Sequence, residues 1–281
     1  MRNLVILGSG RSGTSAVSTL FADQPNVFFG YAPIKPMPSN PDGFYEDAVV
    51  NTVNNILLRR MTGVSLLDVL PRFLVRCVEG LFPWAHRDAR SLWLARPRWP
   101  LRWEVGYELA ELMAGLVSNE PFCLKDPRFS FTLQQWEPFL PADTGFLVVF
   151  RDPRQTIESM QRFASRNDLD RPLAVDRAWL TSHWLLVYRK LIADRDRLRG
   201  PDAWLFVDLA DLVSGEAREA VGGFTRCRVD ASHLEDRLAS SGAGTMSESD
   251  PDHDECRALY EELRTIARAD LASWAGGGRL G

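Results

Sequence analysis

A glycine-rich and hydroxyl-rich loop near the start of the chain has the residue types that bind an anion. The apolar run Leu4–Leu7 predicts a buried strand, and the segment Gly8-Ser-Gly-Arg-Ser-Gly-Thr-Ser15 follows it directly. Residues Ala16–Phe21 then predict the start of a helix. In a strand, turn and helix of this kind, backbone N–H groups and the helix dipole point at one spot. The loop residues that we expect to contact the anion are Gly10, Arg11, Ser12, Gly13, Thr14 and Ser15.

This loop nearly matches the phosphate-binding loop of nucleoside triphosphatases but lacks its lysine. The pattern GxxxxGK[ST] requires a lysine at position 14, where this chain has Thr14. Without that lysine, a kinase or ATPase loses its main counter-charge for the transferred phosphoryl group. The loop carries its cation three residues earlier, at Arg11. The alternative is a glycine-rich turn that only connects a strand to a helix.

A second candidate anion site follows an apolar run in the middle of the chain. Residues Gly145–Phe150 predict a parallel strand buried on both faces, and Arg151 stands at its carboxyl end. Ser159 comes eight positions later, in a helix that Pro153 can start. Because ligands bind at the carboxyl ends of parallel strands, an arginine and a hydroxyl there could hold a second phosphate. The alternative is a surface salt bridge made by Arg151, with Asp152 only capping the helix.

Strand-like apolar runs alternate with helical patterns along the whole chain. The expected strands cover residues 4–7, 26–29, 121–124, 145–150 and 204–207, and the expected later helices cover 48–61, 103–118, 133–139, 155–165, 175–198 and 256–274. This alternation predicts an α/β fold with a P-loop-like parallel sheet flanked by helices on both faces. We expect a single domain over residues 1–281, with a mostly helical, tryptophan-rich insertion at about 48–118.

The composition limits the class of protein. The 281 residues are 45% hydrophobic and carry a net charge of −4, which allows a sizeable core and argues against a nucleic-acid partner. We expect no metal site, because the four cysteines lie far apart without a CxxC pair. No apolar run approaches the roughly 20 residues of a membrane span, and the N-terminus does not resemble a signal peptide. We therefore expect a cytoplasmic protein, and its oligomeric state stays open.

Three motifs together resemble the sulfotransferases that use 3′-phosphoadenosine 5′-phosphosulfate (PAPS). The segment Gly10-Arg-Ser-Gly-Thr-Ser15 resembles their 5′-phosphosulfate loop, most of all in the branch with tyrosylprotein sulfotransferases and many bacterial enzymes. The strand followed by Arg151 and Ser159 resembles their 3′-phosphate motif, and Lys125-Asp-Pro resembles a segment of the tyrosylprotein enzymes. The resemblance covers about residues 3–25 and 121–165. It implies PAPS as co-substrate, no metal, and Lys125 in contact with the transferring sulfuryl group.

The implied reaction is an in-line transfer of the sulfuryl group to an acceptor hydroxyl. We expect Arg11 and Lys125 to stabilise the charge that develops on the bridging oxygen. A base must then take the hydroxyl proton. The candidate bases are Glu46, Asp47, His86 and His183. We favour Glu46, because residues 40–46 resemble an Asn-Pro-x-Gly-Tyr-x-Glu segment of related bacterial enzymes; the alternative is a charge that favours a helix N-terminus. For the two histidines, packing or surface positions are the alternative.

The sequence departs from the resemblance at two places. No carboxylate stands at Gly30-Tyr-Ala32, where the tyrosylprotein enzymes carry their base, and Val207-Asp208 stands where relatives often have Tyr-Glu near the adenine. The tryptophan- and arginine-rich stretch 82–107 is a candidate wall for a small-molecule acceptor, such as a metabolite, glycoside or lipid, unless its tryptophans only pack the insertion. A small-molecule P-loop kinase and a non-catalytic nucleotide-binding module remain the alternative functions.

Overall fold

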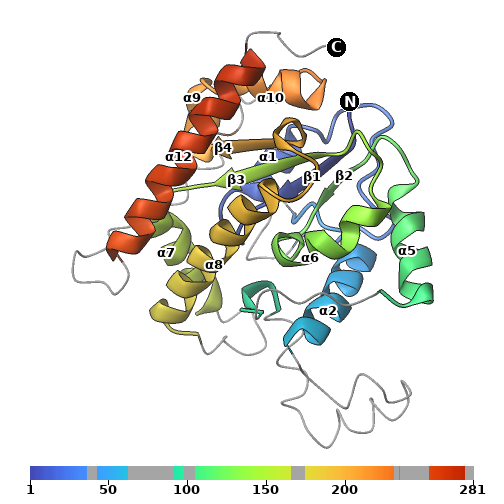
Figure 1. Ribbon diagram of the computed structural model, residues 1–281, viewed down its shortest axis with the longest axis horizontal. Coiled ribbons are helices and arrows are strands. Elements are labelled where there is room, and N and C mark those ends of the chain that lie inside the picture. The colour runs from blue at the N-terminus through green and yellow to red at the C-terminus, as the bar shows by residue number, and fades with distance from the viewer. Residues whose placement is uncertain are drawn as a thin grey trace, which may run out of the picture.

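The structure is a computed structural model that describes residues 1–36, 43–62, 92–97, 105–165, 175–230, 234 and 253–275. Figure 1 shows the elements, which are β1 (Leu4–Leu7), α1 (Thr14–Thr19), α2 (Ala48–Thr62), η2 (Leu92–Leu94), α5 (Tyr107–Val117), β2 (Cys123–Lys125), α6 (Phe129–Trp136), η3 (Glu137–Phe139), β3 (Gly145–Phe150), α7 (Pro153–Ala164), α8 (Arg177–Arg195), η4 (Pro201–Ala203), β4 (Trp204–Asp208), α9 (Leu209–Ser214), α10 (Arg218–Thr225) and α12 (His253–Ala275). No helix in these ranges is long and apolar enough to cross a membrane.

The strands form a parallel sheet in the order β2-β1-β3-β4. In the register of the sheet, Ile6 of β1 pairs with Lys125 of β2, and Leu7 pairs with Val148 of β3. Phe150, the last residue of β3, pairs with Asp208 of β4. All of these strands are buried along their full length, which explains their nearly continuous apolar sequence. The carboxyl ends of the strands therefore lie along one edge of the sheet.

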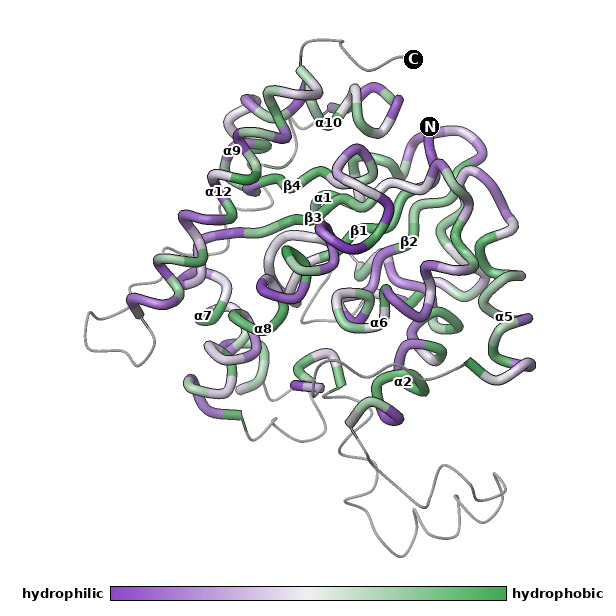
Figure 2. The backbone as a smooth tube through the Cα atoms, in the orientation of Figure 1, coloured by the Kyte–Doolittle hydropathy of each residue, from purple (hydrophilic) through white to green (hydrophobic). Residues whose placement is uncertain are grey.

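Helices cover both faces of the sheet, which confirms the predicted fold class. Side chains alternate along a strand, so that Val5 and Leu7 pack in one apolar cluster and Leu4 and Ile6 pack in the other. The first cluster includes residues of α2, α6, α7, α8 and α12, and the second includes residues of α1, α9 and α10. In Figure 2 the strands form green, apolar stretches between the helices, as expected for a sheet with a core on each side.

The carboxyl ends of β1 and β3 form a topological switch point of the sheet. From the central strand β1 the chain moves to β2 on one side and later to β3 on the other. The helix that follows β1, α1, packs on one face, whereas α7 after β3 packs on the other. Open parallel sheets bind ligands at such a switch point. The glycine-rich loop follows β1 and Arg151 follows β3, so both candidate anion sites lie at this switch point.

The strand predicted at residues 26–29 was wrong, because the structure has only an isolated bridge there, between Phe28 and Phe122. Asn26 has φ 62° and Gly30 has φ 116°, so a left-handed residue on each side limits the extended stretch. Among the helices, α5 and α6 begin furthest from their predicted starts. Helix α6 begins earlier, at Phe129, and helix α5 begins later, at Tyr107.

The range 48–118, where we expect an insertion, is described in part. Helices α2 and α5 and the short helix η2 lie within it. Residues 63–91 and 98–104, and with them His86 and most of the tryptophan-rich stretch, lie outside the described residues. The described helices of this range pack on the α6 side of the sheet.

Candidate functional site

The glycine-rich loop is held in shape by its own residues and by its neighbours. Gly13 has φ 97°, and a Cβ at this position would lie 2.4 Å from Leu209 Cδ2, so only glycine fits before α1. The Ser12 hydroxyl donates to the Ser9 carbonyl at 2.7 Å. Arg11 has φ 68°, an uncommon conformation for a residue with a side chain. Because α1 has only six residues, its dipole is small, and the loop's own backbone and Arg11 must supply most of the attraction for an anion.

Arg11 and Ser159, predicted from separate motifs, are in contact. The Nε of Arg11 donates to the Ser159 Oγ at 3.2 Å, and its guanidinium lies 5.6 Å from the ring centroid of Phe163. Ser159 and Phe163 are one turn apart on α7. The side chain of Arg11 therefore extends from the loop after β1 toward the helix after β3. The two candidate anion sites are therefore in direct contact through these two side chains.

Arg151 lies half-buried at the end of β3, as predicted. Its Nε donates to Gln155 Oε1 at 2.6 Å. Burial lowers the pKa of Arg151, and Arg162 lowers it further while Asp152 opposes the shift. The Asp152 carboxylate accepts from the backbone N–H of Arg154 at 2.8 Å and so caps α7. Burial removes water from the charged guanidinium of Arg151, and an anion nearby would favour the charged form again.

Lys125 and Glu46 form a buried ion pair at the same edge of the sheet. Lys125 Nζ lies 2.7 Å from Glu46 Oε1, and the two residues are 3% and 8% exposed. The other carboxylate oxygen of Glu46 accepts from Asn51 Nδ2 at 3.0 Å. Burial raises the pKa of Glu46, although Lys125 and Arg128 act in the opposite direction. A carboxylate with a raised pKa beside a cation is suited to accept a proton in a reaction.

The segment that carries Glu46 is fastened to the glycine-rich loop and to α2. Ser15 donates through its hydroxyl to the Phe44 carbonyl at 3.2 Å. Asp47 caps α2, because its Oδ1 accepts from the backbone N–H groups of Val49 and Val50, both at 2.9 Å. Its Oδ2 accepts from the N–H of Ala32. Asp47 therefore caps α2, and the neighbouring Glu46 faces Lys125.

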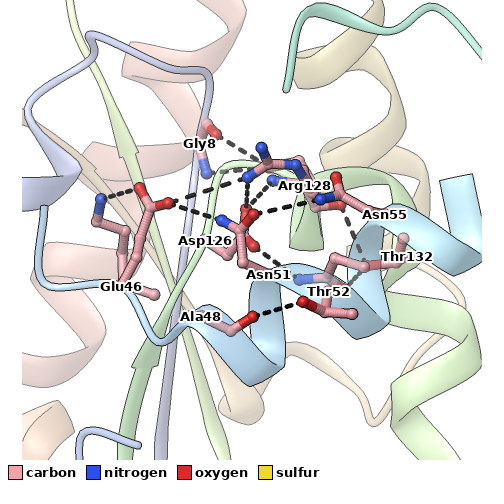
Figure 3. A network of polar contacts seen from close by, with 12 residues as sticks. Gly8, Glu46, Ala48, Asn51, Thr52, Asn55, Asp126, Arg128 and Thr132 are labelled. Atoms are coloured by element: carbon pink, nitrogen blue, oxygen red, sulfur yellow. Dashed lines mark hydrogen bonds and ion pairs between the residues drawn. The ribbon is translucent and has the colours of Figure 1, made fainter. Parts of the chain in front are cut away.

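Arg128 is a charged neighbour of this pair that the sequence reasoning did not single out. Its Nη1 lies 3.0 Å from Asp126 Oδ1 and 3.9 Å from Glu46 Oε2 (Figure 3). Asp126 also accepts from Asn54 Nδ2 at 3.1 Å. The spacing of Arg128 from Lys125 in the Lys-Asp-Pro-Arg segment is the signal that could have identified it. Through Asp126, helix α2 and the turn after β2 hold Arg128 near Glu46.

His183 has a buried position in α8. Its Nδ1 lies 3.0 Å from the Ala95 carbonyl, and its ring packs edge-on against Phe131. Burial lowers the pKa of His183 to about 4. The imidazole is therefore neutral near pH 7, and these contacts agree with the packing alternative considered for this residue.

Asp208, at the end of β4, is also buried. Its Oδ1 accepts from the backbone N–H of Ala210 at 3.0 Å, and its Oδ2 accepts from the Tyr260 hydroxyl at 2.6 Å. Burial raises the pKa of Asp208. The segment expected near an adenine is thus tied to α12 by its carboxylate.

Trp93, which belongs to the described part of the stretch 82–107, lies at the loop. A Cβ built on Gly10 would lie 2.3 Å from Trp93 Cζ3, so the indole packs directly on the Cα of Gly10. The ring of Trp93 also meets Phe163 edge-on, with centroids 5.7 Å apart. The neighbouring Leu94 carbonyl accepts from Trp179 Nε1 at 3.1 Å, which fixes η2 to α8. Trp93 and Phe163 thus form an aromatic wall beside Arg11.

Replacing Gly10 by alanine is expected to destabilise the protein by about 1–3 kcal/mol, because the new methyl group and the indole of Trp93 would overlap. Denaturant unfolding measures the change. Gly115→Ala is the matched control, since a Cβ there meets nothing within 4 Å among the described residues. The cost of Gly10→Ala should shrink when Trp93 is alanine in both proteins. Equal costs in the two backgrounds would contradict the overlap.

Comparison with known proteins gives a family and two distant structures. Residues 3–222 match the family model described as "Sulfotransferase family". Among solved structures, the chain is similar to the sulfotransferase domain from the Synechococcus PCC 7002 olefin synthase, with 17% identity, a TM-score of 0.46 and 98% and 94% of the two chains covered. It is also similar to the sulfotransferase domain from the curacin biosynthetic pathway, with 13% identity, a TM-score of 0.45 and 98% and 97% covered. Curated protein sequences give no match.

Proposed function

Because the chain belongs to the sulfotransferase family, we propose that it transfers a sulfuryl group from PAPS to the hydroxyl of a small-molecule acceptor. The observation that carries the proposal is the buried contact between Lys125 and Glu46, 2.7 Å long, at the carboxyl edge of the sheet. A proton acceptor and a cation are held side by side there, next to the strand that leads into the glycine-rich loop. Transfer to a hydroxyl requires both.

Two groups of residues support binding of the two anionic ends of PAPS. The loop of residues 8–15 would hold the 5′-phosphosulfate with its backbone N–H groups and Arg11. Arg151 and Ser159 would hold the 3′-phosphate at the end of β3. The half-buried position of Arg151 fits an anionic ligand, because burial disfavours the charged guanidinium and an anion would favour it. The contact between Arg11 and Ser159 sets these two sites beside each other.

In the proposed reaction, the acceptor oxygen attacks sulfur and a new S–O bond forms. The bond from sulfur to the bridging oxygen breaks, and adenosine 3′,5′-bisphosphate leaves with the electron pair. The hydroxyl proton passes to Glu46. Lys125 and Arg11 stabilise the negative charge on the bridging oxygen, which is larger in the transition state than in PAPS.

The acceptor would enter on the side of the loop that Trp93 borders. Trp93 and Phe163 present apolar rings next to Arg11. Aromatic side chains bind sugars, lipid chains and ring systems by contact area and stacking. This supports a small organic acceptor, in agreement with the expectation for the stretch 82–107.

Adenosine 3′,5′-bisphosphate is expected to bind tightly in the absence of magnesium, and Mg-ATP is expected to bind much more weakly. The physical reason is that Thr14 stands where an ATP-binding loop has its lysine, while Arg151 and Ser159 offer a site for a 3′-phosphate. Isothermal titration calorimetry of the full chain measures both affinities. Equal or tighter binding of Mg-ATP would favour the kinase and overturn the proposal.

A screen of hydroxylated metabolites with sulfur-labelled PAPS then tests turnover. If the protein binds the bisphosphate tightly but no acceptor is turned over, the non-catalytic module is favoured.

A further inference from the structure

The hydroxyl of Tyr188 lies between the glycine-rich loop and strand β3. Tyr188 belongs to α8, far from both segments in the sequence. Its hydroxyl donates to the Val149 carbonyl at 2.9 Å and accepts from the Ser9 backbone N–H at 3.3 Å. The Ser9 Oγ lies 3.4 Å from the same oxygen. One buried atom therefore joins the start of the loop to the end of the strand that precedes Arg151.

The loop and β3 approach each other closely at this point. A Cβ on Gly8 would lie 2.4 Å from the Val149 carbonyl oxygen, so the glycine allows the two backbones to touch. Tyr188 is fully buried, and its ring packs against Trp184 and Phe150, with centroids 4.9 Å and 6.4 Å away. These buried contacts help to hold the phenol in place. The distance between loop and strand is thus fixed by packing as well as by hydrogen bonds.

The hydrogen bonds of Tyr188 connect the two segments that would hold the two ends of PAPS. Ser9 directly precedes Gly10 in the loop, and Val149 stands two residues before Arg151. Ser130 contacts the loop in a different way, because its hydroxyl lies 3.1 Å from both the backbone N and the backbone O of Gly8. Burial raises the pKa of Tyr188, so its hydroxyl keeps the proton that it donates to Val149.

We propose that Tyr188 is a positioning residue that sets the spacing between the two anion sites and thereby selects nucleotides with anionic groups at both the 5′ and the 3′ positions. The inference rests on the proposed function, since it assigns one end of the nucleotide to each segment. A ligand that engages both sites depends on their spacing. A ligand with a single phosphate engages one site and is insensitive to the spacing.

The test compares the binding of three nucleotides to the full chain and to Tyr188→Phe by calorimetry. The ligands are adenosine 3′,5′-bisphosphate, 5′-AMP and 3′-AMP. We expect the variant to bind the bisphosphate about 10-fold more weakly, and each monophosphate with a change below about 3-fold, because one hydrogen-bonded tie is lost. Thr225→Val is the matched control. It removes a fully buried hydroxyl that donates to Val221, near the opposite edge of the sheet where Arg2 meets α10.

The outcomes distinguish a failure of the inference from a failure of the proposed function on which it rests. If the unaltered protein fails to bind the bisphosphate, both are overturned. If the bisphosphate binds tightly and Tyr188→Phe weakens all three ligands equally, the tyrosine only supports the fold or one site, and the inference alone is overturned. Should Tyr188→Phe fail to fold, Gly8→Ala tests the same spacing, since its methyl group would push the loop away from Val149. An unchanged preference for the bisphosphate in that variant would equally overturn the inference.

Discussion

Replacing Glu46 by glutamine is expected to abolish turnover while leaving the affinity for adenosine 3′,5′-bisphosphate close to its original value. Glutamine keeps the shape of the side chain and its contact with Asn51 but cannot accept a proton. Loss of a general base costs about 10²–10⁴-fold in rate. Steady-state kinetics with labelled PAPS and calorimetry with the bisphosphate measure the two effects. Glu111→Gln, an exposed change on α5, is the matched control.

The pH dependence of the rate provides a second readout for Glu46. The base must be ionised, so the rate should rise with pH as Glu46 loses its proton. Because burial raises the pKa of Glu46, the midpoint should lie above the value of about 4.3 for an ordinary glutamate. Any residual activity of Glu46→Gln should lack this rise. Turnover at the original rate in the variant would remove Glu46 from the reaction and return attention to His86.

Replacing Lys125 by methionine is expected to reduce both the stability and the rate. The change leaves the buried carboxylate of Glu46 without its nearest cation, and breaking a buried pair in this way costs about 3–5 kcal/mol. Arg128, 3.9 Å from Glu46, and Asn51 should keep the loss toward the lower end. The rate should fall by about 10²–10³-fold, as when a donor to a developing oxyanion is removed. Denaturant unfolding and steady-state kinetics measure the two effects.

A double variant separates the structural role of Lys125 from its role in the reaction. In Lys125→Met with Glu46→Gln, no charge of the pair stays buried, so much of the lost stability should return. The rate should not recover with the stability. Lys125→Arg keeps the charge and should retain more stability than the methionine variant. If the double variant is as unstable as Lys125→Met alone, the unpaired carboxylate is not the cause of the loss.

The elements near the site could be predicted from the sequence because their signals are local. Four apolar residues before a glycine-rich turn predict β1 and its loop, and the run Gly145–Phe150 predicts β3 with Arg151 at its end. Residues 26–29 have the same apolar character, yet the structure forms only a bridge there. The left-handed conformations of Asn26 and Gly30 limit that stretch, and these backbone angles are known only from the structure.

The contacts that make up the site depend on pairs of residues far apart in the chain. Arg11 and Ser159 are separated by 148 positions, and Lys125 and Glu46 by 79. No periodicity relates such residues. They meet because the strand order brings the carboxyl ends of β1, β2 and β3 to one edge, and because Ser15 and Asp47 fasten the segment of Glu46 in place.

The sequence by itself determined the family, the parallel sheet and the residue types of two candidate anion sites, since all of these depend on short motifs after apolar runs. Only the tertiary structure decided which partner each of these residues contacts. It paired Glu46 with Lys125, placed Trp93 on Gly10 and put the Tyr188 hydroxyl between the loop and β3. The physical reason is that a motif carries local conformational preferences, whereas close packing of distant segments depends on the whole fold.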